Sequence, residues 1–165
     1  MKINGSEKYD NAAKIIHESH MDAALNLAQR GLGNVWPNPA VGCVIVKNNR
    51  VIGRGWTAFG GRPHAETEAL RNAGQDVLGS TVYVTLEPCN HYGKTPPCVD
   101  ALIDAGIKKI VIATLDPDDR VSGKGIKRLE NAGIDVEVGM AKAQAEKINQ
   151  GFFLRVGNSR PFITF

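Results

Sequence analysis

Cysteines are few in this sequence, and long hydrophobic runs are missing. The chain has 165 residues and three cysteines, an odd and sparse set that does not build the disulfide framework of a small secreted protein. No apolar stretch approaches the roughly 20 residues that a membrane-spanning helix needs. The first twenty residues are polar and mixed in charge, so they lack the apolar core of a signal peptide. These absences predict a soluble protein of a reducing compartment, the cytoplasm, with no membrane partner.

Positive charge is present but is not concentrated. The formal net charge is +3, and the basic residues are spread singly or in pairs, without the dense stripe that binds nucleic acid. Apolar residues make up 42% of the chain and charged residues 22%, which is ordinary for a globular domain of this length. We therefore expect one ordinary domain whose partner is an anionic small molecule rather than a nucleic acid.

Two hydrophobic periodicities alternate along the chain. Met21, Leu25, Ala28 and Leu32 recur at helical spacing, whereas residues 81–85 are rich in β-forming side chains. The same reasoning predicts helices over 21–32, 65–73, 99–106, 126–132 and 140–150, and strands over 41–46, 51–52, 81–85, 110–113 and 134–138. Strands that alternate with helices of this length predict an α/β layered domain, with a largely parallel sheet after a first hairpin.

The two ends of the chain depart from this alternation. Residues 1–18 form a polar N-terminal extension, and residues 151–165 begin like a new strand and then stop. Of the residues outside the motifs below, His17 and His20 are expected on the surface of the first helix, and Cys43 in the core.

Four residues carry the chemistry. His64 and Glu66 are followed by Cys89 and, nine positions later, by Cys98. Each lies near the carboxyl end of a predicted strand or the start of a predicted helix. In an α/β sheet these ends converge on the ligand crevice. One imidazole and two thiolates give Zn²⁺ three protein ligands and leave its fourth position to a water, whose pKa zinc lowers to about 7. Glu66 is better placed to move protons beside that water than to bind the metal. The combination is typical of hydrolytic zinc deaminases.

Other interpretations stay open at this point. A His-x-Glu pair alone is common, and free cysteines are often buried as packing residues. A structural zinc module would need a fourth protein ligand, for which His91 is the nearby candidate. The same zinc chemistry also serves deaminases of cytidine, guanine or tRNA adenosine.

The spacing of the two cysteines is longer than in the generic deaminase pattern and is therefore specific. The loop 88–98 resembles that of the deaminase of bacterial riboflavin biosynthesis, and the resemblance covers nearly the whole chain from about Met21. It extends through residues 38–42, 53–56, 64–66, 116–117 and 123–125.

The resemblance implies a fold and a reaction. The fold is a three-layer, cytidine-deaminase-like α/β domain, in which a mixed five-stranded sheet has helices on both faces. The reaction is the hydrolysis of 2,5-diamino-6-(5-phosphoribosylamino)pyrimidin-4-one to 5-amino-6-(5-phosphoribosylamino)uracil and ammonia. The resemblance also implies that His64, Cys89 and Cys98 bind zinc, that Glu66 moves the protons, and that Asn38, His91, Lys94 and Asp116 line or adjoin the substrate pocket.

The phosphate of such a substrate needs a cation. Lys94, on the long loop, is the first candidate. Lys124 is the second, in a glycine-rich turn whose backbone N–H groups could also face an anion. Plain solvation is the alternative for both lysines.

The same resemblance divides the chain. Residues 1–150 correspond to the zinc-dependent deaminase domain, and residues 151–165 resemble the linker into a reductase domain that follows the deaminase in the bacterial form. A homo-oligomer stays open, because deaminases of this fold often associate.

Overall fold

The architecture was obtained as a computed structural model that describes residues 5–93, 95–118 and 122–163, with side chains described from residue 14 onward. Its centre is a five-stranded sheet in the order β2-β1-β3-β4-β5. The strands are β1 (Gly42–Lys47), β2 (Arg50–Trp56), β3 (Thr81–Val84), β4 (Lys109–Ile112) and β5 (Asp135–Val138). β1 pairs antiparallel with both β2 and β3, whereas β3, β4 and β5 run parallel to one another. The predicted mixed sheet, parallel after its hairpin, is confirmed.

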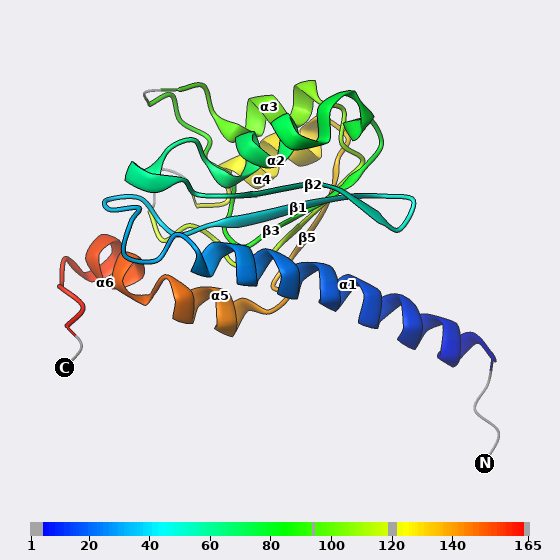
Figure 1. The fold of residues 1–165 in the computed structure, drawn as a ribbon, viewed down its shortest axis with the longest axis horizontal. Coiled ribbons are helices and arrows are strands. Elements are labelled where there is room, and N and C mark those ends of the chain that lie inside the picture. Colours follow the sequence, from blue (N-terminus) through cyan, green and yellow to red (C-terminus); the bar gives the residue numbers. More distant parts are fainter. Residues whose placement is uncertain (1–4, 94, 119–121, 164–165) are drawn as a thin grey trace, which may run out of the picture.

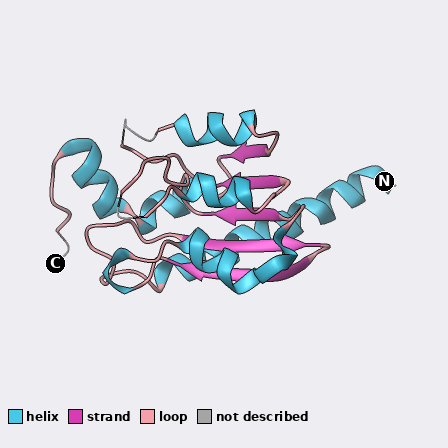
Figure 2. Ribbon diagram, turned by 90° about the horizontal axis from the view of Figure 1, so that it is seen from above, coloured by secondary structure: helices cyan, strands magenta, loops and turns pink. Residues whose placement is uncertain are grey.

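The hairpin between β1 and β2 is closed by two asparagines. Asn48 and Asn49 have φ values of 50° and 58°, the left-handed conformation that a tight hairpin turn requires and that asparagine tolerates. The two strands that this turn joins lie on the antiparallel side of the sheet (Figure 2).

Helices cover both faces of the sheet and make three layers (Figure 1). One face carries α2 (Ala65–Ala73), α3 (Cys98–Asp104) and α4 (Lys124–Asn131); the other carries α1 (Gly5–Gln29) and α5 (Lys142–Ile148). Each face has its own apolar cluster. Ala69, Leu102 and Leu129 are buried in the first cluster, and Met21 and Ala145 in the second. The two sides of the buried strands contribute alternately to the two clusters, which is the expected outcome of a period-two pattern between two helical layers.

The N-terminal helix is longer than the apolar pattern predicts. α1 starts at Gly5, so it takes in most of the segment interpreted as a polar extension, and it runs on beyond the sheet toward the N-terminus (Figure 2). The expectation that His17 and His20 lie on the surface is wrong. Both rings are half-buried against Tyr83, whose hydroxyl lies 2.5 Å from Nδ1 of His17.

The strand expected after residue 150 is also wrong. The chain forms helix α6 (Gln150–Asn158) there, and Phe152 and Phe153 pack against the apolar cluster on the α2 side of the sheet. Burial of the two rings therefore favours the helix, although aromatic residues favour strands in isolation. No helix in the described ranges is long and apolar enough to cross a membrane.

The topology brings four loops to one end of the sheet. The carboxyl ends of β3 and β4 point the same way because the strands are parallel, and the start of β1 and the end of β2 lie at that end because both pair antiparallel. The connecting segments 35–41, 57–64, 85–97 and 113–123 therefore meet there. This is the end of an α/β sheet at which ligands bind.

Candidate metal centre and pocket

Three potential metal ligands converge at that end. The ligand atoms of His64, Cys89 and Cys98 all lie within 4.8 Å of one another. His64 precedes the first residue of α2, Cys98 is the first residue of α3, and Cys89 lies in the loop after β3. Nδ1 of His64 is 3.3 Å from Sγ of Cys98 and 3.6 Å from Sγ of Cys89, so the imidazole presents this nitrogen to both sulfurs.

The two cysteines are electrostatically unlike. Two hydrogen bonds lower the pKa of Cys89 to about 4. The one from the Cys98 thiol has the larger effect, and the one from His64 the smaller. The backbone N–H of Cys98 also donates to Sγ of Cys89 at 3.2 Å. The shared hydrogen bond and burial raise the pKa of Cys98. The site thus stabilises a thiolate at Cys89, the form of cysteine that binds metals.

This donor set fits a zinc ion with an open position. One ring nitrogen and two sulfurs are ligands that zinc prefers, and the N–H···S bond supplies the outer support that metal thiolates commonly have. In the described part of the chain, no fourth His, Cys, Asp or Glu joins the cluster. His91, which a closed structural site would need, is an exposed residue of the adjoining loop.

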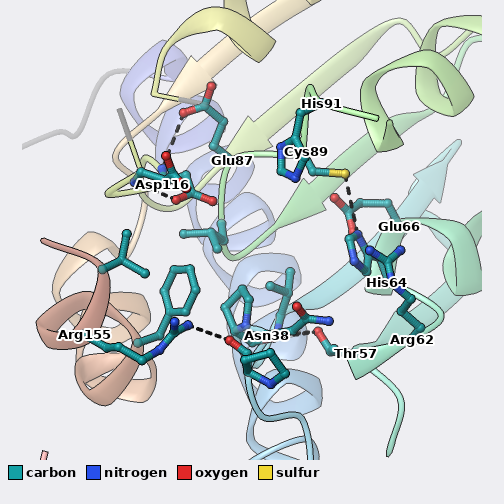
Figure 3. Close-up of a pocket in the computed structure, with 17 residues that line it drawn as sticks. Asn38, Thr57, Arg62, His64, Glu66, Glu87, Cys89, His91, Asp116 and Arg155 are labelled. Atoms are coloured by element: carbon teal, nitrogen blue, oxygen red, sulfur yellow. Dashed lines mark hydrogen bonds between the residues drawn. The ribbon is translucent and has the colours of Figure 1, made fainter. Parts of the chain in front are cut away.

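Glu66 lies beside the cluster without belonging to it. It is the second residue of α2, and only 4% of it is exposed. Burial raises the pKa of its carboxyl, and the neighbouring Cys89 acts in the same direction. Figure 3 shows the carboxyl group next to His64 and Cys89. A buried acid with a raised pKa is suited to taking up and releasing protons near neutral pH.

A cavity of about 280 Å³ opens over this cluster. Figure 3 shows His64, Glu66 and Cys89 at one side of it and Arg155 at the other. Its lining residues come from all four loops, from the start of α2 and from α6: Pro37, Asn38, Pro39, Val41, Thr57, Arg62, His64, Glu66, Leu86, Glu87, Cys89, His91, Asp116, Asp118, Phe152, Arg155 and Val156.

Of the substrate-binding residues expected from the sequence, three line this cavity. They are Asn38, His91 and Asp116. Lys94 lies outside the described residues, and Lys124 is an exposed residue at the start of α4 that does not line the cavity.

The glycine-rich turn before α4 binds an anion of the protein itself. The N–H of Gly123 donates to Oε2 of Glu87 at 3.1 Å, and the N–H of Asp116 points to the same oxygen at 3.4 Å. Glu87 is 3% exposed. One buried carboxylate therefore ties both ends of the loop that carries Asp116 into the cavity.

Sequence reasoning missed both arginines of the cavity. Arg62 donates from Nη1 to Oγ1 of Thr95 at 2.5 Å, which joins the segment before α2 to the cysteine loop. Arg155 comes from α6, in the segment interpreted as a linker. The proximity of Arg62 to His64 in sequence was a usable signal for the first, whereas Arg155 has no local motif. Glu87 was also missed, although it directly precedes Pro88-Cys89 in the sequence.

Comparisons with known proteins define the class. The family model described as the cytidine and deoxycytidylate deaminase zinc-binding region matches residues 14–114. The chain therefore belongs to the cytidine and deoxycytidylate deaminase family. The resemblance drawn from the sequence is confirmed at this level, as is the cytidine-deaminase-like fold.

Relatives within the family are more specific. The chain is 49% identical to the riboflavin biosynthesis protein RibD of Aquifex aeolicus, over 90% of this chain and 42% of that protein. It is also 49% identical to the diaminohydroxyphosphoribosylamino-pyrimidine deaminase of Buchnera aphidicola subsp. Schizaphis graminum, over 86% of this chain and 97% of that protein.

A solved structure agrees with these relatives. The Thermotoga maritima diaminohydroxyphosphoribosylaminopyrimidine deaminase/5-amino-6-(5-phosphoribosylamino)uracil reductase superimposes with a TM-score of 0.85 at 46% identity, over 89% of this chain and 43% of that one. The chain thus spans about two fifths of the length of its longer relatives and nearly all of the shorter Buchnera protein.

Proposed function

We propose that this chain hydrolyses the ring amine of 2,5-diamino-6-(5-phosphoribosylamino)pyrimidin-4-one, releasing ammonia and leaving 5-amino-6-(5-phosphoribosylamino)uracil in riboflavin biosynthesis. One observation carries the proposal: His64, Cys89 and Cys98 converge beside buried Glu66 in a cavity. The chain is also 49% identical to a protein that bears the name of this deaminase and is covered over 97% of its length.

Zinc is the metal that the donor set favours. His64, Cys89 and Cys98 would hold it, and it would supply an activated water as the nucleophile. The ligand thiols must stay reduced, so the proposal assigns the protein to a reducing compartment, the cytoplasm.

Glu66 moves the protons in this proposal. Its carboxylate accepts a proton from the attacking water and delivers it to the ring nitrogen next to the carbon that is attacked. The hydroxyl group now on that carbon gives up its proton by way of the same carboxyl group to the amine, the carbon–nitrogen bond breaks, and ammonia leaves as the carbonyl forms. The raised pKa of Glu66 suits both transfers, because the group must hold and give up a proton at the working pH.

Polar groups of the cavity wall recognise the rest of the substrate. The side chain of Asn38 donates from Nδ2 to the carbonyl oxygen of Gly61 at 2.7 Å, which turns Oδ1 toward ring N–H groups as an acceptor. Asp116 and His91 face the ribose arm. For the phosphate, Arg62 joins Lys94 as a candidate cation, since Arg62 lines the cavity.

Ammonia release by the zinc-loaded chain tests this proposal. The phosphoribosylated diaminopyrimidine is offered in parallel with its dephosphorylated form, cytidine, guanine and a tRNA that carries the target adenosine. We expect turnover of the phosphorylated pyrimidine, at least tenfold weaker turnover of its dephosphorylated form, and none of the others. Preference for a free nucleoside or for tRNA would overturn the choice of substrate, and zinc binding without any turnover would favour a structural zinc module.

A further inference from the structure

The loop that carries Asn38 is held at two points by the C-terminal segment. On one side of Asn38, the buried side chain of Asn149 pairs with the backbone of Ala40. The Ala40 N–H donates to Oδ1 at 2.8 Å, and Nδ2 donates back to the Ala40 carbonyl oxygen at 2.8 Å. Asn149 is 4% exposed, so both bonds are shielded from water. Breaking them would leave buried polar groups without partners.

On the other side of Asn38, Arg155 makes the second connection. Its Nη2 donates to the carbonyl oxygen of Pro37 at 2.6 Å, and its guanidinium group lies 4.8 Å from the centre of the Trp36 ring. The same group lies 5.5 Å from the Phe152 ring of α6. One planar cation thus joins α6 to the loop through a hydrogen bond and two ring contacts, an arrangement that lysine does not reproduce.

The two connections bracket Asn38. Pro37 and Ala40 are fixed from outside the loop, and Figure 3 shows Asn38 between Arg155 on one side and Thr57 on the other. Phe152, Arg155 and Val156 also line the cavity themselves. Helix α6 therefore forms the cavity wall that lies across from the cluster of His64 and the cysteines (Figure 3).

We propose that Arg155 is a positioning residue for the substrate, which fixes the Asn38 loop against α6 and so sets where the pyrimidine ring lies relative to Glu66. The inference rests on the proposed function. It makes the segment after residue 148 a part of the deaminase site, although the family match ends at residue 114.

The test measures kcat and KM for the phosphoribosylated diaminopyrimidine with wild-type protein and with Arg155→Ala, Asn38→Ala and the double variant. Loss of one hydrogen bond that orders the loop should raise KM roughly 2- to 10-fold in Arg155→Ala, with zinc content unchanged. In the Asn38→Ala background, Arg155→Ala should raise KM by a clearly smaller factor, because the group that Arg155 positions is gone. Arg155→Lys should recover little of the loss.

Arg30→Ala is the matched control. Arg30 is an exposed arginine whose guanidinium group lies 5.0 Å from the Trp56 ring, but it does not line the cavity. Its removal should leave kcat and KM as in wild type. An unchanged KM in Arg155→Ala would overturn the inference. So would an equal rise in KM on Arg155→Ala in the wild-type and Asn38→Ala backgrounds.

A second readout does not depend on activity. The chain has two tryptophans, so Arg155→Ala should shift the NMR indole resonance of Trp36, and Arg30→Ala that of Trp56. A wild-type protein that is inactive while these shifts occur as expected contradicts the proposed function alone. An active wild-type protein in which Arg155→Ala leaves the Trp36 resonance unmoved contradicts the position assigned to Arg155.

Discussion

Asn38, in the wall of the cavity, meets Gly61 at a distance that only glycine permits. Nδ2 of Asn38 donates to the Gly61 carbonyl oxygen at 2.7 Å, and a Cβ atom added to Gly61 would lie 2.2 Å from that nitrogen. Gly61 also has a φ of +83°, a conformation that residues with a side chain seldom adopt. The missing side chain therefore sets the orientation of the Asn38 amide.

A methyl group at Gly61 should displace this amide. We expect Gly61→Ala to raise KM for the phosphoribosylated pyrimidine roughly tenfold, since a hydrogen bond of the binding site is lost or misdirected. Zinc content should stay at one per chain, because the ligands lie elsewhere in the site. Steady-state kinetics and metal analysis on the same preparation check both parts.

Gly60→Ala separates displacement of Asn38 from backbone strain. Gly60 has a φ of +74°, close to that of Gly61, but no atom lies within 4 Å of a Cβ atom added there. Both variants should lose about 1 kcal/mol of stability from the left-handed backbone. Gly61→Ala should lose more, because its Cβ atom would also lie 2.9 Å from the Val35 carbonyl oxygen. Only Gly61→Ala should raise KM, and an equal rise in both variants would exclude a role of the Asn38 amide.

Cys98 and Cys43 should differ sharply in zinc binding. Cys98→Ala removes a proposed ligand and should lower the zinc content of the purified protein well below one per chain. Cys43→Ala removes a fully buried cysteine of β1 that lies outside the ligand cluster, so it should cost stability and leave zinc in place. Atomic absorption on the two variants gives the comparison. Full zinc content in Cys98→Ala would mean that the ligand assignment is wrong.

Because of Asp116, the free energy of unfolding should fall as the pH rises through a defined window. Burial raises the pKa of its carboxyl to about 6, and the Asp118 and Glu87 carboxylates act in the same direction. The unfolded side chain titrates near 3.9. Between those values the folded protein keeps a proton that the unfolded chain has lost, so the free energy of unfolding falls as pH rises.

Asp116→Asn cannot ionise and should escape this fall. Relative to wild type, the variant should gain stability as the pH is raised from about 4 to about 6, in urea unfolding experiments at constant zinc. A stability difference that is independent of pH would contradict the raised pKa of Asp116.

Much of the fold follows from local pattern. The helix predicted over 65–73 has those bounds in the structure, because its apolar face is periodic and Gly74, with a φ of 61°, ends it. The first strand of the hairpin and the buried strands β3 and β4 were predicted to within about one residue at each end, since short β-branched runs between polar turns have few alternatives, whereas β2 extends to Trp56, well beyond the predicted 51–52. His64 follows β2 and Cys89 follows β3. Both strands pair antiparallel with β1, so their carboxyl ends lie at the same edge of the sheet, and the two side chains converge there.

The remainder depends on contacts between distant segments. Phe152 and Phe153 suit a strand by propensity, and only their packing on a core built by other elements decides for a helix. One cation of the cavity, Arg155, was beyond local reasoning for the same reason. Arg155 belongs to the site because α6 folds back on the loop of Asn38, whereas Lys124 has the right charge in a plausible turn but lies outside the cavity lining.

The central claim is that Glu66 moves protons in a hydrolytic deamination at the His64, Cys89 and Cys98 cluster. The most direct measurement is ammonia release from the phosphoribosylated diaminopyrimidine by Glu66→Gln, with zinc content determined in the same sample. Glu68→Gln, on the same helix but paired with Arg71, is the control and should keep wild-type turnover. We predict that Glu66→Gln keeps one zinc per chain and loses roughly 10²–10⁴-fold in kcat. Turnover within a few fold of wild type at full zinc content would contradict the account.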